Sequence, residues 1–65
     1  MSNHSIFVDF ILLALEKGLK TEEEGVVACG ELAQYSLLDW QYLHDQNEPL
    51  YHKVEEWCSK HPPSL

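Results

Sequence analysis

Apolar side chains recur every three or four residues along most of this chain, the spacing of helices that each bury one face. The pattern is clearest in the middle of the sequence, where an apolar stripe continues for about five helical turns. The residues of this stripe are Val26, Cys29, Ala33, Leu37, Trp40 and Leu43. Because helical spacing dominates throughout, we expect an all-α fold.

Local signals divide the chain into three helices. Gly18 suits the left-handed position that follows a helix, and Thr21-Glu22-Glu23-Glu24 is a capping box that begins the next one. Asn47-Glu48-Pro49 marks a third start, because proline is accepted in a first turn but disrupts a helix interior. We therefore expect a single domain, residues 1–65, that forms a three-helix bundle with helices at about 5–17, 21–45 and 48–60.

The long second helix contains one point of ambiguity. Ser36-Leu37-Leu38-Asp39 has the form of a second capping box, which allows a break or kink near Tyr35. Since the apolar stripe runs through this point, we expect a continuous helix.

The first helix carries more apolar surface than a small bundle can cover. On a helical wheel its apolar residues occupy about three quarters of the circumference, whereas two neighbouring helices cover about half. Each large apolar side chain left in water loses roughly 1.5–3 kcal/mol of stabilisation that its burial would give, which is a large amount for a small domain. These residues are Ile6, Phe7, Val8, Phe10, Ile11, Leu12, Leu13, Ala14, Leu15 and Leu19.

A second chain is the simplest cover for that surface. A chain of 65 residues has a marginal core of its own, and its two cysteines form no disulfide framework. We expect a homodimer about a two-fold axis, with a compact monomer clamped by a bent second helix as the alternative. The expected interface residues are Phe7, Phe10, Ile11, Leu15, Tyr35, Leu38, Trp40 and Tyr42.

The charge balance disfavours nucleic acid and anionic membranes as direct partners. The net charge is −7, and the four basic residues are scattered lysines. An acidic patch, Glu22, Glu23 and Glu24, lies at a predicted helix start. One alternative function is therefore an acidic mimic, of the antitoxin or phage-inhibitor type, that occupies a basic nucleic-acid site on its target.

The sequence contains no constellation that predicts catalysis. Cys29 and Cys58 lie on or beside apolar helix faces, where thiols are poorly reactive. Gly25 and Gly30 have the spacing of a phosphate loop, but Glu31 stands where that motif needs lysine. We expect no enzyme activity and no catalytic residues.

A few potential metal ligands gather near the C-terminal end. His44, Glu48 and His52 follow one another at four-residue spacing, although the proline-marked helix start between them argues against one shared helix face. No Cys-x-x-Cys pair accompanies them. We expect no metal or other cofactor, and keep a small zinc sensor that uses His44, His52, Cys58 and His61 as a second alternative.

The N-terminal residues do not have the features of a secretory signal. No basic residue precedes the apolar run 6–15, which is also shorter than the ~20 residues that span a bilayer. We expect a cytoplasmic location. The function predicted overall is that of a small acidic interaction module, a regulator, adaptor or inhibitor of another protein.

Overall fold

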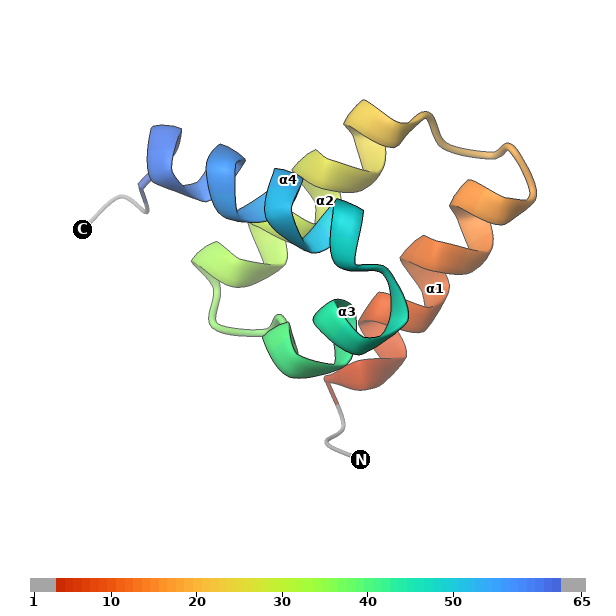
Figure 1. Ribbon diagram of the computed structural model, residues 1–65, viewed down its shortest axis with the longest axis horizontal. Helices are drawn as coiled ribbons and strands as arrows, with labels where there is room; N and C mark the ends of the chain where they lie inside the picture. Colours follow the sequence, from red (N-terminus) through yellow and green to blue (C-terminus); the bar gives the residue numbers. More distant parts are fainter. Residues whose placement is uncertain (1–3, 63–65) are drawn as a thin grey trace.

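The structure, a computed structural model, describes residues 4–62 and contains no strand among them. Its four helices are α1 (Ser5–Glu16), α2 (Glu22–Gln34), α3 (Trp40–Gln46) and α4 (Glu48–Lys60) (Figure 1). The all-α prediction is confirmed, but the three-helix prediction is wrong, because the expected helix 21–45 is divided into α2 and α3. Within residues 4–62 no helix has the length and apolar character that crossing a bilayer requires.

The break lies at the C-terminal end of α2. Ser36 has a left-handed backbone with φ of 59°. The amides of Ser36 and Leu37 donate hydrogen bonds to carbonyl oxygens in the last turn of α2. The Ser36 amide donates to the Ala33 carbonyl oxygen at 3.0 Å, and the Leu37 amide donates to the Leu32 carbonyl oxygen at 2.8 Å. This is the pair of bonds that commonly ends a helix with glycine, formed here by a serine.

The next helix begins with a cap at Asp39. Its carboxylate accepts a hydrogen bond from the Tyr42 amide at 3.1 Å, which satisfies a first-turn donor of α3. Asp39 is therefore the N-cap of α3, which begins at Trp40, and Ser36 does not cap this helix.

The other helix boundaries follow the sequence signals closely. Gly18 has φ of 72°, and the Leu19 amide donates to the Ala14 carbonyl oxygen at 2.8 Å, which closes α1. Thr21 and Glu24 form the reciprocal capping box at the start of α2, with bonds of 2.8 and 3.2 Å. These local predictions are confirmed.

A single residue joins α3 to α4. Asn47 ends α3, and its side-chain oxygen also accepts from the Leu50 amide at 3.1 Å to cap α4. Pro49 lies in the first turn of α4, where it costs no helical hydrogen bond. The predicted helix start at residue 48 is confirmed.

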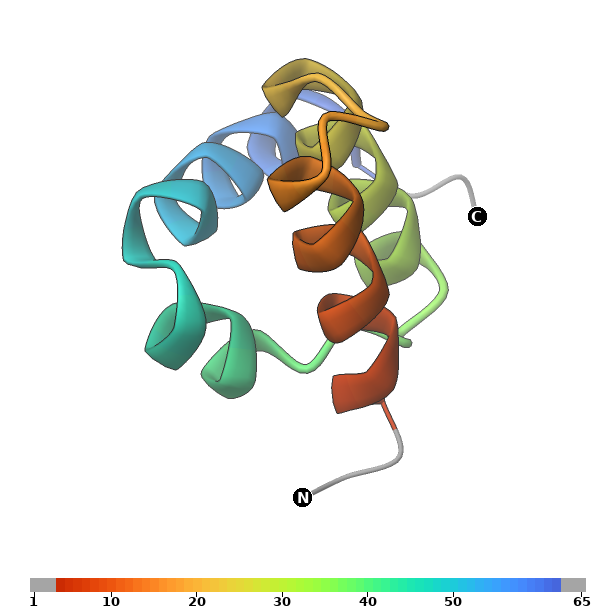
Figure 2. The same ribbon diagram turned by 90° about the vertical axis from the view of Figure 1, so that its right-hand side faces the viewer.

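The four helices form a ring in which each packs against two others. α1 contacts α2 and α3, and α4 contacts the same two helices from the other side (Figure 2). The core inside the ring consists of Val8, Ile11, Cys29, Leu38, Leu43, Leu50 and Val54. As a result, each helix has an outer side that no other helix of the described residues covers.

Two glycines of α2 allow its neighbours to approach closely. A Cβ atom on Gly30 would lie 2.1 Å from Cε3 of Trp57, so the indole of α4 occupies the space of the missing side chain. A Cβ atom on Gly25 would lie 3.0 Å from the methyl carbons of Leu15 in α1. The spacing of these glycines therefore reflects helix packing.

Polar and aromatic contacts close the other two corners of the ring. The Tyr42 hydroxyl donates to Asp9 Oδ1 at 2.6 Å, which ties α3 to α1. Trp40 of α3 meets Tyr51 of α4 edge to face, with ring centroids 5.8 Å apart.

Replacing Ser36 with glycine is expected to stabilise the protein by about 0.5–1 kcal/mol. Glycine relieves the left-handed strain of about 1–2 kcal/mol, partly offset by its greater flexibility in the unfolded chain. Urea unfolding followed by circular dichroism measures the change. The matched variant Ser36→Val should lower the free energy of unfolding, and a Val variant as stable as the Gly variant would contradict the assigned turn.

Gly30→Ala is expected to destabilise the protein by about 1–3 kcal/mol, although alanine is the better helix former. The added methyl group would force Trp57 off α2. Thermal unfolding of Gly30→Ala and of Glu31→Ala, on the exposed side of the same helix, makes the comparison. An alanine at position 30 that raises the melting temperature would show that α2 and α4 do not approach as closely as described.

Candidate protein-docking surface

The outer side of α1 is apolar along about two turns. Ile6, Phe10 and Leu13 are 52, 63 and 46% exposed, and their spacing of four and three residues sets them on one line. They lie opposite Val8 and Ile11, which enter the core. We call these three residues the outer stripe.

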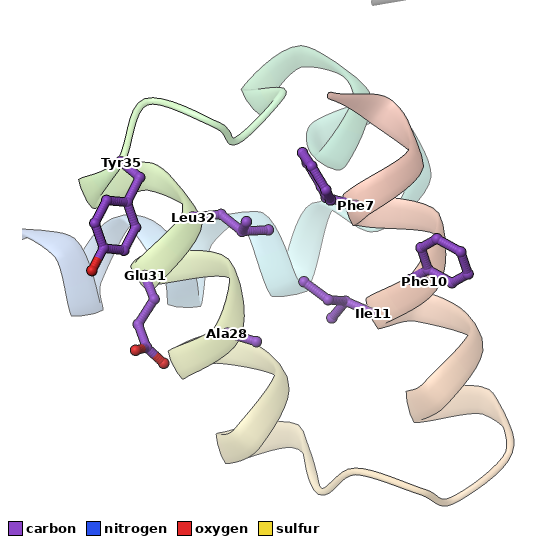
Figure 3. A pocket seen from close by; sticks show the side chains of 7 residues that line it. All are labelled: Phe7, Phe10, Ile11, Ala28, Glu31, Leu32 and Tyr35. Carbon is purple, nitrogen blue, oxygen red and sulfur yellow. The ribbon is translucent and has the colours of Figure 1, made fainter. Parts of the chain in front are cut away.

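A groove between α1 and α2 continues this apolar surface. It has a volume of about 400 Å³ and is lined by Phe7, Phe10, Ile11, Ala28, Glu31, Leu32 and Tyr35. Figure 3 shows Ile11 pointing from α1 toward α2, with Ala28 and Leu32 on the facing side, while Phe10 points away from α2. Six of these residues are apolar or aromatic, and Glu31 is the single charged member of the α1–α2 groove.

Three of the predicted interface residues are exposed and belong to this surface. Phe7 and Phe10 are 37 and 63% exposed on α1, and Tyr35, at the end of α2, is 75% exposed. All three line the α1–α2 groove.

The other five predicted interface residues pack within the chain. Ile11 and Leu38 are buried in the core, and only an edge of Ile11 reaches the groove. Leu15 packs beside Gly25, and Trp40 and Tyr42 make the contacts with Tyr51 and Asp9 described above. In this structure they hold the ring of helices together.

The sequence prediction of the interface did not name four exposed apolar residues: Ile6, Leu13, Leu19 and Val27. Ile6 and Leu13 belong to the outer stripe. A signal was present, because they share one line on the wheel with Phe10 and lie opposite Val8. The sequence alone does not say which of the two sides of α1 faces inward.

Every charged residue on the two helices beside the groove is acidic. α1 carries Asp9 and Glu16, and α2 carries four glutamates with no lysine or arginine. A second hollow on α2, which shares Ala28 and Glu31 with the α1–α2 groove, is lined by Glu23 and Glu24 and by one lysine, Lys20. The apolar groove therefore has an acidic border along α2.

The predicted acidic patch is partly engaged inside the chain. Glu24 belongs to the capping box, and the hydrogen bond from the Thr21 backbone holds the pKa of its carboxyl below the usual value. That stabilising bond is present above the ordinary carboxyl pKa and is lost as the pH falls through the lowered one. Glu22 pairs with Lys53, so among the three only Glu23 has no partner within residues 4–62.

The potential metal ligands fall into two separate groups. His44 Nε2 and His52 Nε2 lie 3.3 and 3.6 Å from the same Glu48 oxygen. Cys58 is six residues beyond His52 on α4, about 9 Å along the helix axis, and lines another hollow together with His61. Among residues 4–62, no group of three or more such side chains is placed to hold a metal ion.

The two cysteines are free thiols with raised pKa values. Burial, and then the nearby Cys58 thiol, raises the pKa of Cys29 to about 11. Burial also raises the pKa of Cys58, which is partly exposed. Both thiols are therefore largely protonated near neutral pH, and poor nucleophiles.

Alkylation by iodoacetamide at about pH 8 is expected to modify Cys58 first. Cys29 should react more than about tenfold more slowly in the folded protein, because it is buried and its thiolate is scarce. Mass spectrometry over time measures both rates, with Cys58→Ser to isolate Cys29. Equal rates in the folded chain would contradict the burial of Cys29, whereas equal rates in denaturant are expected.

Similarity to known proteins does not identify this surface. Comparison of the chain with protein-family models, with curated proteins and with solved structures found no match. The function is therefore argued from the exposure, shape and charge of the residues described above.

Proposed function

We propose that this chain is a small non-enzymatic interaction module that regulates, adapts or inhibits another protein and works as a homodimer. The dimer forms through the outer stripe of α1. The observation that carries the proposal is that Ile6, Phe10 and Leu13, each about half exposed or more, lie on one line of α1 opposite the core.

The exposed apolar area supports a contact between proteins. Taking about 200 Å² per large side chain, the outer stripe exposes roughly 320 Å². That is within the range of the largest apolar patches on monomers, which are often functional. Two copies would bury roughly 640 Å² from these side chains alone, so with a polar rim we expect a weak, reversible dimer.

The charges on α1 are compatible with self-association. A two-fold axis near Phe10 sets the two copies of α1 antiparallel and brings Ile6 of each copy near Leu13 of the other. Asp9, the one charged residue within this span, bonds Tyr42 on the α3 side. Antiparallel helices also place the opposite ends of their dipoles side by side.

The alternatives weighed from the sequence draw less support from the geometry. An acidic mimic would use Glu22, Glu23 and Glu24, of which two are already engaged within the chain. A zinc sensor would need His44 and His52 to lie near Cys58 and His61. His44 on α3 and His52 on α4 meet at Glu48, whereas Cys58 and His61 line a separate hollow at the C-terminal end of α4.

Phe10→Glu is expected to weaken the dimer at least tenfold, because it places a charge at the centre of the contact. Light scattering across a dilution series through about the micromolar range measures the mass in solution. Gln46→Glu adds the same charge at an exposed position on α3 and should leave dimerisation unchanged. Leu13→Glu is a second test, should Phe10→Glu fail to fold.

Two results would overturn the proposed dimer. The first is a wild-type chain that remains a monomer throughout the dilution series. The second is a folded Phe10→Glu or Leu13→Glu variant, checked by circular dichroism, that dimerises as well as the wild type.

A further inference from the structure

We infer that the α1–α2 groove binds a basic amphipathic helix of the partner protein, an inference that rests on the proposed role as an interaction module. The groove and the outer stripe lie on adjacent sides of α1 and share Phe10 on the ridge between them. One face can therefore join two copies while the other receives the partner.

The shape and lining of the groove fit a helix. Ile11 lies opposite Ala28, whose small side chain leaves room between α1 and α2 (Figure 3). The lining residues on α2 run from Ala28 to Tyr35, about 10 Å along the helix axis, so the groove accommodates about two helical turns. A helix satisfies its own backbone hydrogen bonds and inserts apolar side chains at three- and four-residue spacing into such a groove.

The acidic residues around the groove favour basic residues on either side of the apolar face of that helix. Glu31 lies in the groove, and Glu23 and Glu24 line the hollow that adjoins it on α2. A helix with lysine or arginine beside its apolar face places these cations next to the carboxylates.

One lysine of this chain lies within that border. Lys20 lines the hollow together with Glu23 and Glu24, and its charge helps to lower the pKa of the Glu24 carboxyl. The two lysines of α4 are engaged elsewhere: Lys53 pairs with Glu22 of α2, and Lys60 pairs with Glu56 of α4. Lys17 lies in the connection between α1 and α2 and does not line the groove or the adjoining hollow. Glu23, Glu24 and Glu31 outnumber Lys20 around the groove, so the border keeps a net negative charge that attracts cations of the partner.

The same charges disfavour a second copy as the occupant of the groove. Another α1 brings apolar side chains but only acidic charges, Asp9 and Glu16. Its carboxylates would face Glu31 across the contact, and like charges in that position cost affinity. A basic helix meets both the apolar and the electrostatic requirement.

Two synthetic peptides of about 14 residues, roughly four turns, test the inference with the full chain. Both carry the same leucine stripe, and their polar positions are lysine in one and glutamate in the other. Fluorescence anisotropy should show the lysine peptide binding at least tenfold more tightly, with the difference shrinking as salt is added. A scrambled lysine peptide without the stripe should bind at least tenfold more weakly.

Glu31→Lys locates the binding within the protein. It should weaken binding of the lysine peptide about three- to tenfold, because it reverses the charge in the groove. The matched control Glu55→Lys makes the same charge change on α4, where Glu55 is half exposed, and should alter affinity by less than about twofold. Ala28→Phe, which fills the groove, should weaken binding further.

The outcomes separate this inference from the proposed dimer. Equal affinity for the two peptides, or equal effects of Glu31→Lys and Glu55→Lys, overturns the basic-helix inference. A Glu31→Lys variant that dimerises more tightly would assign the groove to a second copy, which also overturns it but leaves the interaction module in place. Peptide binding by a chain that light scattering shows to be a monomer supports the groove and overturns the dimer alone.

Discussion

The left-handed turn at Ser36 determines how the rest of this chain is arranged. A continuous helix over residues 22–46 would be about 37 Å long at 1.5 Å per residue, more than the 34 Å long axis of the whole molecule. The turn lets α3 fold back against α1 and α4 and complete the ring. The ring also leaves the outer side of α1 uncovered, so the exposed apolar surface on which the proposed function rests is a consequence of the same turn.

The helix boundaries that could be predicted are those set by residues within one turn of each other. Gly18, the Thr21–Glu24 capping box and the Asn47 cap each form local hydrogen bonds, and all lie where the sequence indicates. The break after α2 could not be predicted in the same way. Ser36 has no strong preference for a left-handed backbone, and the apolar stripe continues through the break because α2 and α3 face one core.

The excess of apolar surface on α1 could be predicted from the wheel, but its direction could not. Asp9 and Glu16 lie on the border between the inner and outer sides, so they do not mark which side meets water. Packing decides the matter: Ile11 turns inward, and Ile6 and Leu13 stay outside. The groove depends on how α1 and α2 sit together in space, which residue spacing within a single helix does not specify.

The junction at Asn47 restricts which changes of length the chain can tolerate. Since Asn47 is both the C-cap of α3 and the N-cap of α4, no further loop residue between these helices can absorb a change in length. A single inserted residue would rotate the register of α4 relative to α3 by about 100° and carry Leu50 and Val54 away from the core. Five residues separate α1 from α2, so changes in length are better accommodated there, at a loop beside the proposed binding groove.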